Sequence, residues 1–124
     1  MKALLVDDSS VARAMLGRAL TSLGFEVCEA TSGNEALLKL EEHTEPPDVA
    51  LIDWNMPGMS GLQLVEEVRR LEGLEKLQIV MVTMETEMER VAKALEAGAD
   101  EFVMKPFSAG DLVEKFKQLG LLER

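Results

Sequence analysis

The sequence has few of the residues that build disulfides and zinc sites. Among 124 residues it contains one cysteine, Cys28, and one histidine, His43. A lone cysteine cannot form an internal disulfide, and one thiol with one imidazole does not supply the ligand set of a zinc site. We therefore expect neither feature, and we interpret Cys28 as a buried residue of a strand.

Basic residues are also scarce. The chain has 13 lysines and arginines against 23 aspartates and glutamates, which gives a formal net charge of −10. Neutralising nucleic-acid phosphates requires clustered basic side chains, so this composition argues against a nucleic-acid partner. We interpret the basic residues of two helical segments as charges on solvated faces, namely Arg69, Arg70, Lys115 and Lys117.

Long hydrophobic runs are missing as well. The segment Met1 to Asp8 has only a short apolar stretch before two acids, and it predicts neither a signal peptide nor a membrane span. We expect a cytoplasmic protein that does not contact the membrane. No Walker loop or dinucleotide fingerprint occurs. The length of 124 residues, of which 47% are hydrophobic, fits one domain over residues 1–124.

Short apolar runs alternate with segments of helical periodicity along the whole chain. The helical spacing is seen in Val11, Met15, Ala19 and Leu23, and in Met88, Val91, Ala92 and Leu95. Predicted strands are Lys2 to Val6, Phe25 to Glu29, Val49 to Ile52, Leu77 to Val82 and Glu101 to Met104.

Helix boundaries carry local signals. Four helix starts have a hydroxyl followed three residues later by an acid or amide, a pair that can satisfy backbone donors of the first turn. Helix ends are marked by glycines that can adopt left-handed backbone. The starts are Ser32 with Glu35, Ser60 with Gln63, Thr86 with Glu89 and Ser108 with Asp111, and the glycines are Gly24, Gly98 and Gly120.

Five strands alternating with helices predict an α/β fold. Each crossover between parallel strands is right-handed and covers one face of the sheet, so we expect a doubly wound, five-stranded, mostly parallel sheet with helices on both faces. The apolar runs Ala50 to Ile52 and Ile79 to Val82 suit strands buried on both faces. In such sheets ligands bind beyond the carboxyl ends of the strands.

Polar side chains gather at these predicted strand ends. They are Asp7 and Asp8 after the first strand, Asp53 after the third, Thr83 after the fourth and Lys105 after the fifth. Neighbouring carboxylates repel by roughly 4 kcal/mol per close pair at an effective dielectric near 20, which favours recruitment of a cation. Magnesium prefers oxygen ligands and bridges to phosphate. The arrangement predicts a Mg²⁺ and phosphoryl site.

Asp53 is the best candidate for a nucleophile, because a carboxylate can accept a phosphoryl group as an aspartyl phosphate. Lys105 and Thr83 would then stabilise the phosphoryl oxygens. Each residue also has an ordinary explanation: Asp7 or Asp8 as a helix cap, Thr83 as a β-branched strand residue and Lys105 as a surface charge. Only their combination favours the phosphoryl site.

Four segments of the chain together resemble a known family, the receiver domains of two-component response regulators, and are most similar to the single-domain chemotaxis type. The segments are Val6-Asp7-Asp8-Ser9, the stretch Asp53-Trp54-Asn55-Met56-Pro57-Gly58-Met59-Ser60-Gly61, Val82-Thr83 and Lys105-Pro106-Phe107. The resemblance covers the whole chain. It implies the flavodoxin-like strand order 2-1-3-4-5 and a cis bond between Lys105 and Pro106.

The resemblance also implies the chemistry of the site. A phosphohistidine of a histidine kinase or phosphotransfer protein would donate to Asp53, and the domain would catalyse only its own phosphorylation and dephosphorylation. Asp8, Asp53 and the backbone carbonyl of Asn55 would ligate Mg²⁺, with Asp7 helping through water. Thr83 and Phe102 would form the conformational switch, while Asn55 and Glu85 would tune attack by water.

Phosphorylation would then change the affinity for a partner protein. We expect a monomer whose output face includes the fourth helix, the fifth strand and the fifth helix, with Arg90, Lys93, Phe102 and Lys115 on or near it. The resemblance suggests a flagellar motor switch component as the target, although another kinase or phosphotransfer protein is equally compatible.

Three positions depart from the family pattern, and one of them, Ser60 in place of a frequent aspartate, changes only a helix cap. Phe102 replaces the tyrosine of close relatives and lacks its hydroxyl. Met84 follows Thr83 where a small residue is common, and we hypothesise that it narrows access to the site. Equal phosphorylation rates for the wild type and Met84→Ala would remove this hypothesis.

Other readings of the same residues stay open. A phosphorylation-independent adaptor of the same fold needs no phosphoryl transfer. A phosphatase of the haloacid dehalogenase type also uses an aspartate nucleophile, but it requires a second acid where Asn55 stands. A flavodoxin is disfavoured because Asp7 and Asp8 would repel the flavin phosphate. An EF-hand is disfavoured because Pro57 and Leu64 occupy ligand positions.

Overall fold

Five strands and five helices alternate in the computed structural model of the chain, which describes residues 1–42, 45–84, 88–105 and 107–122. In chain order the elements are β1 (Lys2–Val6), α1 (Ser10–Ser22), β2 (Glu26–Ala30), α2 (Gly33–Glu42), β3 (Val49–Asp53), α3 (Gly61–Arg70), β4 (Gln78–Met84), α4 (Met88–Ala97), β5 (Glu101–Lys105) and α5 (Ala109–Gln118).

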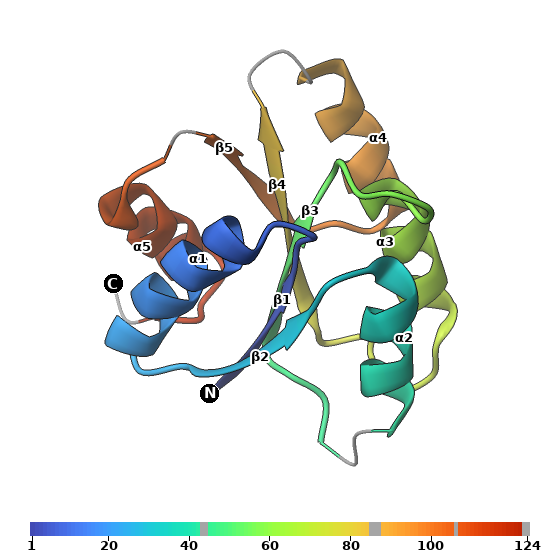
Figure 1. Cartoon of the computed structure of the whole chain (residues 1–124), viewed down its shortest axis with the longest axis horizontal. Helices are drawn as coiled ribbons and strands as arrows, with labels where there is room; N and C mark the ends of the chain where they lie inside the picture. The colour runs from blue at the N-terminus through green and yellow to red at the C-terminus, as the bar shows by residue number, and fades with distance from the viewer. Residues whose placement is uncertain (43–44, 85–87, 106, 123–124) are drawn as a thin grey trace.

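The strands form one parallel sheet in the order β2-β1-β3-β4-β5. Helices α1 and α5 cover one face, and α2, α3 and α4 cover the other (Figure 1). This confirms the predicted doubly wound α/β fold and the strand order 2-1-3-4-5. Because all strands run the same way, their carboxyl ends meet along one edge of the sheet.

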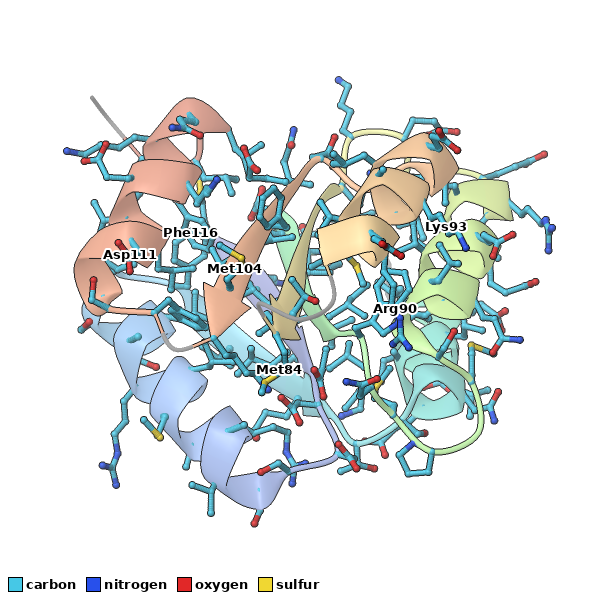
Figure 2. The ribbon with its side chains drawn as sticks, turned by 90° about the horizontal axis from the view of Figure 1, so that it is seen from above. Met84, Arg90, Lys93, Met104, Asp111 and Phe116 are labelled. Carbon is cyan, nitrogen blue, oxygen red and sulfur yellow. The ribbon has the colours of Figure 1, made fainter. Side chains whose placement is uncertain are left out.

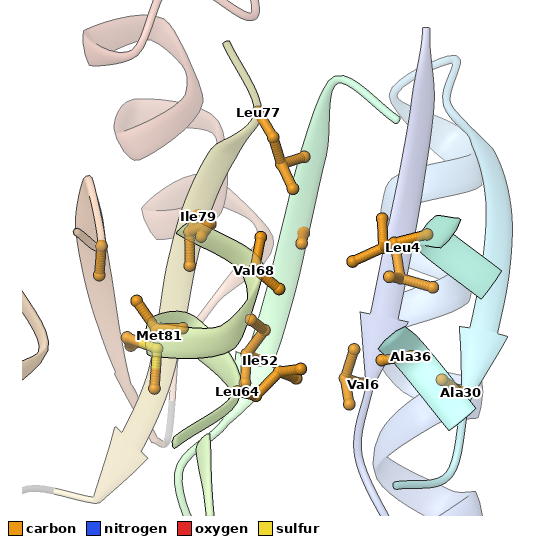
Figure 3. Close-up of a cluster of buried hydrophobic side chains, with 14 of the residues drawn as sticks. Leu4, Val6, Ala30, Ala36, Ile52, Leu64, Val68, Leu77, Ile79 and Met81 are labelled. Atoms are coloured by element: carbon orange, nitrogen blue, oxygen red, sulfur yellow. The ribbon is translucent and has the colours of Figure 1, made fainter. Parts of the chain in front are cut away.

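Two hydrophobic cores lie on opposite faces of the sheet. The first joins alternate strand residues to α2 and α3, and Figure 3 shows Leu4, Ile52 and Met81 contributing to it from three strands. The second joins the remaining strand residues to α1 and α5 and includes the edge-to-face pair of Phe25 and Phe116. All five residues of β3 are buried, as expected for a central strand covered on both faces.

The predicted capping signals largely hold. Both halves of a capping box form at two helix starts, with Ser60 and Gln63 beginning α3 and Ser108 and Asp111 beginning α5. At α2 the Ser32 hydroxyl accepts a hydrogen bond from the Glu35 backbone N–H. The predicted start at Thr86 lies outside the described residues.

One helix start was missed. The Ser9 hydroxyl caps α1 by accepting from the Ala12 backbone N–H at 3.2 Å. The third position of this helix holds alanine rather than an acid or amide, so no capping-box pattern appears in the sequence. The helix ends were predicted correctly, since Gly24, Gly98 and Gly120 all have positive φ.

The exposed side of α1 differs from what its apolar spacing suggested. Val11 and Met15 have relative exposures of 68% and 66%, and the residues that α1 buries are Leu16 and Leu20. The helix contains two apolar stripes, and only one can face the sheet. Cys28 is also only half-buried, because β2 is an edge strand.

The interpretation of Arg69 as a solvated charge was wrong. Its guanidinium group is partly buried and donates to the backbone carbonyls of Leu74, Leu77 and Gly98 and to the carboxylate of Asp100. Asp100 also accepts from the backbone N–H of Ile79. Arg69 therefore ties the end of α3 to the starts of β4 and β5, whereas its neighbour Arg70 is exposed.

Strand boundaries differ from the predictions by one or two residues. Asp53 and Lys105 are the last residues of β3 and β5 rather than residues after them, and Thr83 lies inside β4, which continues to Met84. The second strand begins at Glu26 and ends at Ala30. Polar residues at a strand end can still pair in the sheet, which the apolar pattern does not reveal.

Candidate functional site

Three carboxylates come together at the carboxyl edge of the sheet. Asp7 and Asp8 follow β1, and Asp53 ends the neighbouring strand β3. One carboxylate oxygen from each residue lies within 4.8 Å of the others. The predicted acidic cluster is therefore present, with Asp7 and Asp53 buried and Asp8 exposed toward solvent.

Asp7 is the most enclosed of the three acids, with a relative exposure of 2%. Its Oδ1 accepts a hydrogen bond from the Ser9 backbone N–H at 2.9 Å. Its Oδ2 is buried and has no hydrogen-bond partner among the described residues, and the Lys105 ammonium lies 3.8 Å away. A buried carboxylate oxygen without a donor is costly, and a hard cation or its bound water would satisfy it.

Asp53 lies between opposing charges. Its relative exposure is 8%, and the Lys105 Nζ stands 3.6 Å from its Oδ1. Burial raises the pKa of this carboxyl to about 6, and the neighbouring Asp7 adds to the rise while Lys105 and the Asn55 backbone N–H oppose it. The carboxylate is thus held in its charged form at neutral pH at a cost that a cation would relieve.

The remaining predicted polar residues surround this carboxylate. Thr83 is 2% exposed on β4, where its hydroxyl contacts the Met84 carbonyl oxygen at 3.4 Å. Strand β4 is the neighbour of β3, with Asp53 opposite Val82 in the register. Thr83 and Lys105 therefore flank the Asp53 end of the sheet from the next two strands.

A close backbone approach fixes the loop that follows Asp53. The Trp54 backbone N–H donates to the Val82 carbonyl, and the Gly61 N–H donates back to the Trp54 carbonyl. A Cβ on Gly61 would stand 2.6 Å from the Asp53 carbonyl oxygen and 2.9 Å from the Trp54 Cα. Only glycine permits this approach, so α3 begins directly against the end of β3.

Phe102 lies half-buried on β5, packed against the core on the α4 side of the sheet. The Lys115 ammonium from α5 sits 4.8 Å from the ring centroid and 3.1 Å from the Glu101 carboxylate. Lys115 was interpreted as a solvated charge and also as a residue near the output face. The structure makes it a contact of the predicted switch residue.

Arg90 contacts the loop that follows Asp53. Its guanidinium carbon lies 5.7 Å from the centroid of the Trp54 ring, and its Nη1 donates to the Asn55 Oδ1 at 3.3 Å. The sequence offered no signal for this contact, since Arg90 and Asn55 are 35 residues apart. Figure 2 shows Arg90 and Lys93 extending from α4 on the side away from Met104.

Two predicted features lie outside the described residues, namely the side chain of Glu85 and the bond between Lys105 and Pro106. Within the described part of the chain, no helix is long and apolar enough to cross a membrane.

The chain belongs to the response regulator receiver domain family, whose model matches residues 3–117. Proteins of this family act in signalling. The chain is 41% identical over 120 residues to the chemotaxis protein CheY of Pseudomonas aeruginosa, covering 96% of this chain and 95% of that protein. It is 42% identical over 118 residues to CheY1 of Helicobacter pylori, covering 94% of each.

Solved structures agree with these sequence relatives. The chemotaxis protein CheY4 of Vibrio cholerae superposes with a TM-score of 0.87 at 35% identity, covering 95% of this chain and 97% of that one. The receiver domain of the sensor histidine kinase PA1611 of Pseudomonas aeruginosa gives a TM-score of 0.85 at 26% identity, over 96% and 97% of the two chains, and its structure is described with a magnesium ion in the active site cleft. The present chain is thus a receiver domain of the CheY type.

Proposed function

We propose that residues 1–124 form a phosphorylation-dependent signalling switch that accepts a phosphoryl group on Asp53 and then changes its affinity for a partner protein. The observation that carries this proposal is the position of Asp53. Its carboxylate lies 3.6 Å from the Lys105 ammonium, beside the acids Asp7 and Asp8, at the edge where such sheets bind ligands.

The transfer itself needs little from the protein beyond positioning and charge. An Asp53 Oδ attacks phosphorus, the bond from phosphorus to the donor's imidazole nitrogen breaks, and the imidazole keeps the electron pair and takes up a proton. Lys105 neutralises the growing negative charge on the phosphoryl oxygens, and the Thr83 hydroxyl donates to one of them.

A divalent cation fits the acids that surround Asp53. When bound, Mg²⁺ would supply the positive charge that offsets the repulsion between these carboxylates and an incoming phosphoryl group. Asp8, Asp53 and the backbone carbonyl of Asn55 are the proposed ligands, with Asp7 contributing through water. The Oδ2 of Asp7, which accepts no hydrogen bond from the described residues, and the raised pKa of Asp53 both support a positive charge at this position.

We propose a histidine kinase or phosphotransfer protein as donor and an output protein such as a flagellar motor switch component as target. The CheY relatives support a role in chemotaxis. We further propose a monomeric protein of the cytoplasm. Thr83 and Phe102 lie on neighbouring strands and share one face of the sheet, as a pair that moves together requires. The Lys115 ammonium over the Phe102 ring couples α5 to that pair.

Intact mass measurement tests the proposal directly. We expect the protein to gain the mass of one phosphoryl group when it is exposed to acetyl phosphate and Mg²⁺, and to gain none when the metal is chelated. Asp53→Asn is the matched control, because it keeps the shape of the side chain and removes the nucleophile. A metal-independent gain, or an equal gain in the variant, would contradict the proposal. A protein that turns over a phosphate ester repeatedly would instead be a phosphatase, and one that never gains mass would be an adaptor.

A further inference from the structure

We infer that Arg90 is a positioning residue for Asn55 and thereby sets how fast the phosphoryl group on Asp53 is lost to water. This inference rests on the proposed function. It concerns a side chain of α4 that has no part in the transfer chemistry described above.

Asn55 is held at both of its ends. Its backbone N–H donates to the Asp53 carboxylate, and its side-chain Oδ1 accepts a hydrogen bond from the Arg90 Nη1 at 3.3 Å. The Asn55 side chain is exposed, so solvent alone would leave its amide group to rotate. With the oxygen engaged by a cation, the amide nitrogen is confined to the opposite side of the group.

Arg90 is itself exposed, and its contact with Trp54 restricts where its guanidinium group lies. Its guanidinium group lies over the Trp54 ring, 5.7 Å from the centroid. Trp54 is 7% exposed, and its backbone is bonded on one side to Val82 and on the other to Gly61. A planar guanidinium can lie against a ring and donate from its edge at the same time, and its rigid fork fixes the direction in which it donates.

The contact matters for the lifetime of the aspartyl phosphate because of where Asn55 stands. It is two residues beyond Asp53 and lines a recess of about 560 Å³ together with Trp54, Arg90 and Lys93. In the inferred mechanism, the attacking water reaches the phosphoryl group past the Asn55 side chain. An amide that is already oriented can direct such a water without losing further freedom in the transition state.

The inference predicts slower hydrolysis when the contact is removed. In Arg90→Met the side chain can still cover Trp54 but cannot donate, and we expect the adduct to decay about 2- to 10-fold more slowly, the effect of one ordinary hydrogen bond. Lys93→Met is the matched control, since it removes a cation from the same recess, and it should decay as the wild type does. Arg90→Lys keeps a cation and a donor but loses the rigid fork, so its decay rate should lie between those of the wild type and Arg90→Met.

A double-mutant cycle separates this role from a merely structural one. If Arg90 acts through Asn55, then Arg90→Met has no further effect on the decay rate in an Asn55→Ala background. The decay is followed by intact mass after the donor has been removed, with Mg²⁺ present. Additive effects of the two substitutions, wild-type decay in Arg90→Met, or slower decay in Arg90→Lys than in Arg90→Met would each overturn the inference.

A second readout needs no phosphorylation. The side-chain amide resonances of Asn55 should shift in Arg90→Met and stay in place in Lys93→Met, and the absence of that difference would also overturn the inference. The two proposals therefore fail separately. If the resonances shift but the protein never gains a phosphoryl group, the proposed function is wrong. If the phosphoryl group is gained but its rate of loss is the same in Arg90→Met as in the wild type, only the present inference is wrong.

Discussion

Replacing Asp53 by asparagine is expected to stabilise the metal-free protein at neutral pH. Burial and the neighbouring Asp7 raise the pKa of the Asp53 carboxyl from 3.8 to about 6. The folded state therefore binds this proton more tightly than the unfolded state does, and the free energy of unfolding falls as the pH rises from about 4 to about 6. Asparagine keeps the shape of the side chain and carries no charge.

The size of the effect follows from the same shift. One pKa unit corresponds to about 1.4 kcal/mol, so the ionised Asp53 costs the folded state up to about 3 kcal/mol above pH 6. Lys105 remains paired with Asp7 in the variant, at 3.8 Å, which limits the loss of favourable charge. We expect Asp53→Asn to be more stable than the wild type by about 1 to 3 kcal/mol at pH 7.5 and to show little difference at pH 4.

Urea unfolding between pH 4 and pH 8 in the presence of a chelator measures this difference. Glu114→Gln, which removes an exposed carboxylate from α5, serves as the control and should show no comparable dependence on pH. Mg²⁺ should then stabilise the wild type and leave Asp53→Asn nearly unchanged. The prediction fails if Asp53→Asn is less stable than the wild type at pH 7.5, or if the difference in their free energies of unfolding is the same at every pH.

Two further substitutions test the backbone approach at Gly61 and the hydrogen bonds of Arg69. Gly61→Ala places a methyl group 2.6 Å from the Asp53 carbonyl oxygen. We therefore expect a loss of about 1 to 3 kcal/mol in the free energy of unfolding and slower phosphorylation by acetyl phosphate. Wild-type values of both quantities would contradict the close approach. Arg69→Met removes the guanidinium donor from the Leu74, Leu77 and Gly98 carbonyls and from Asp100, and urea unfolding should show a loss of about 2 to 4 kcal/mol. Arg70→Met, one residue along and exposed, should lose less than about 0.5 kcal/mol, and equal losses would mean that Arg69 is not the anchor.

The fold and the acidic site could be predicted because both depend on regularities along the chain. Short apolar runs that alternate with segments of helical periodicity imply a parallel sheet. Parallel strands bring Asp7, Asp53 and Lys105 to one edge of that sheet, whatever the details of packing. The contacts of Arg69 and Arg90 could not be predicted. Each is made by a long side chain that reaches an element some thirty residues away, and nothing in the local sequence distinguishes such an arginine from a solvated one.

The two apolar stripes of α1 illustrate a related limit. Periodicity identified the helix, but Val11 and Met15 share the helical spacing with the residues that are buried. Which stripe faces the sheet depends on the crossover geometry and on how Leu16 and Leu20 fit against β1 and the neighbouring helix. A sequence pattern can thus contain more apolar surface than the core accepts.

The central claim is that the phosphoryl group resides on Asp53. Borohydride reduces an acyl phosphate to an alcohol, so treatment of the phosphorylated protein followed by peptide mass mapping locates the modified residue. We expect homoserine in place of aspartate at position 53, only after exposure to both acetyl phosphate and Mg²⁺. Reduction at Asp7 or Asp8, or at no carboxylate of the chain, would contradict it.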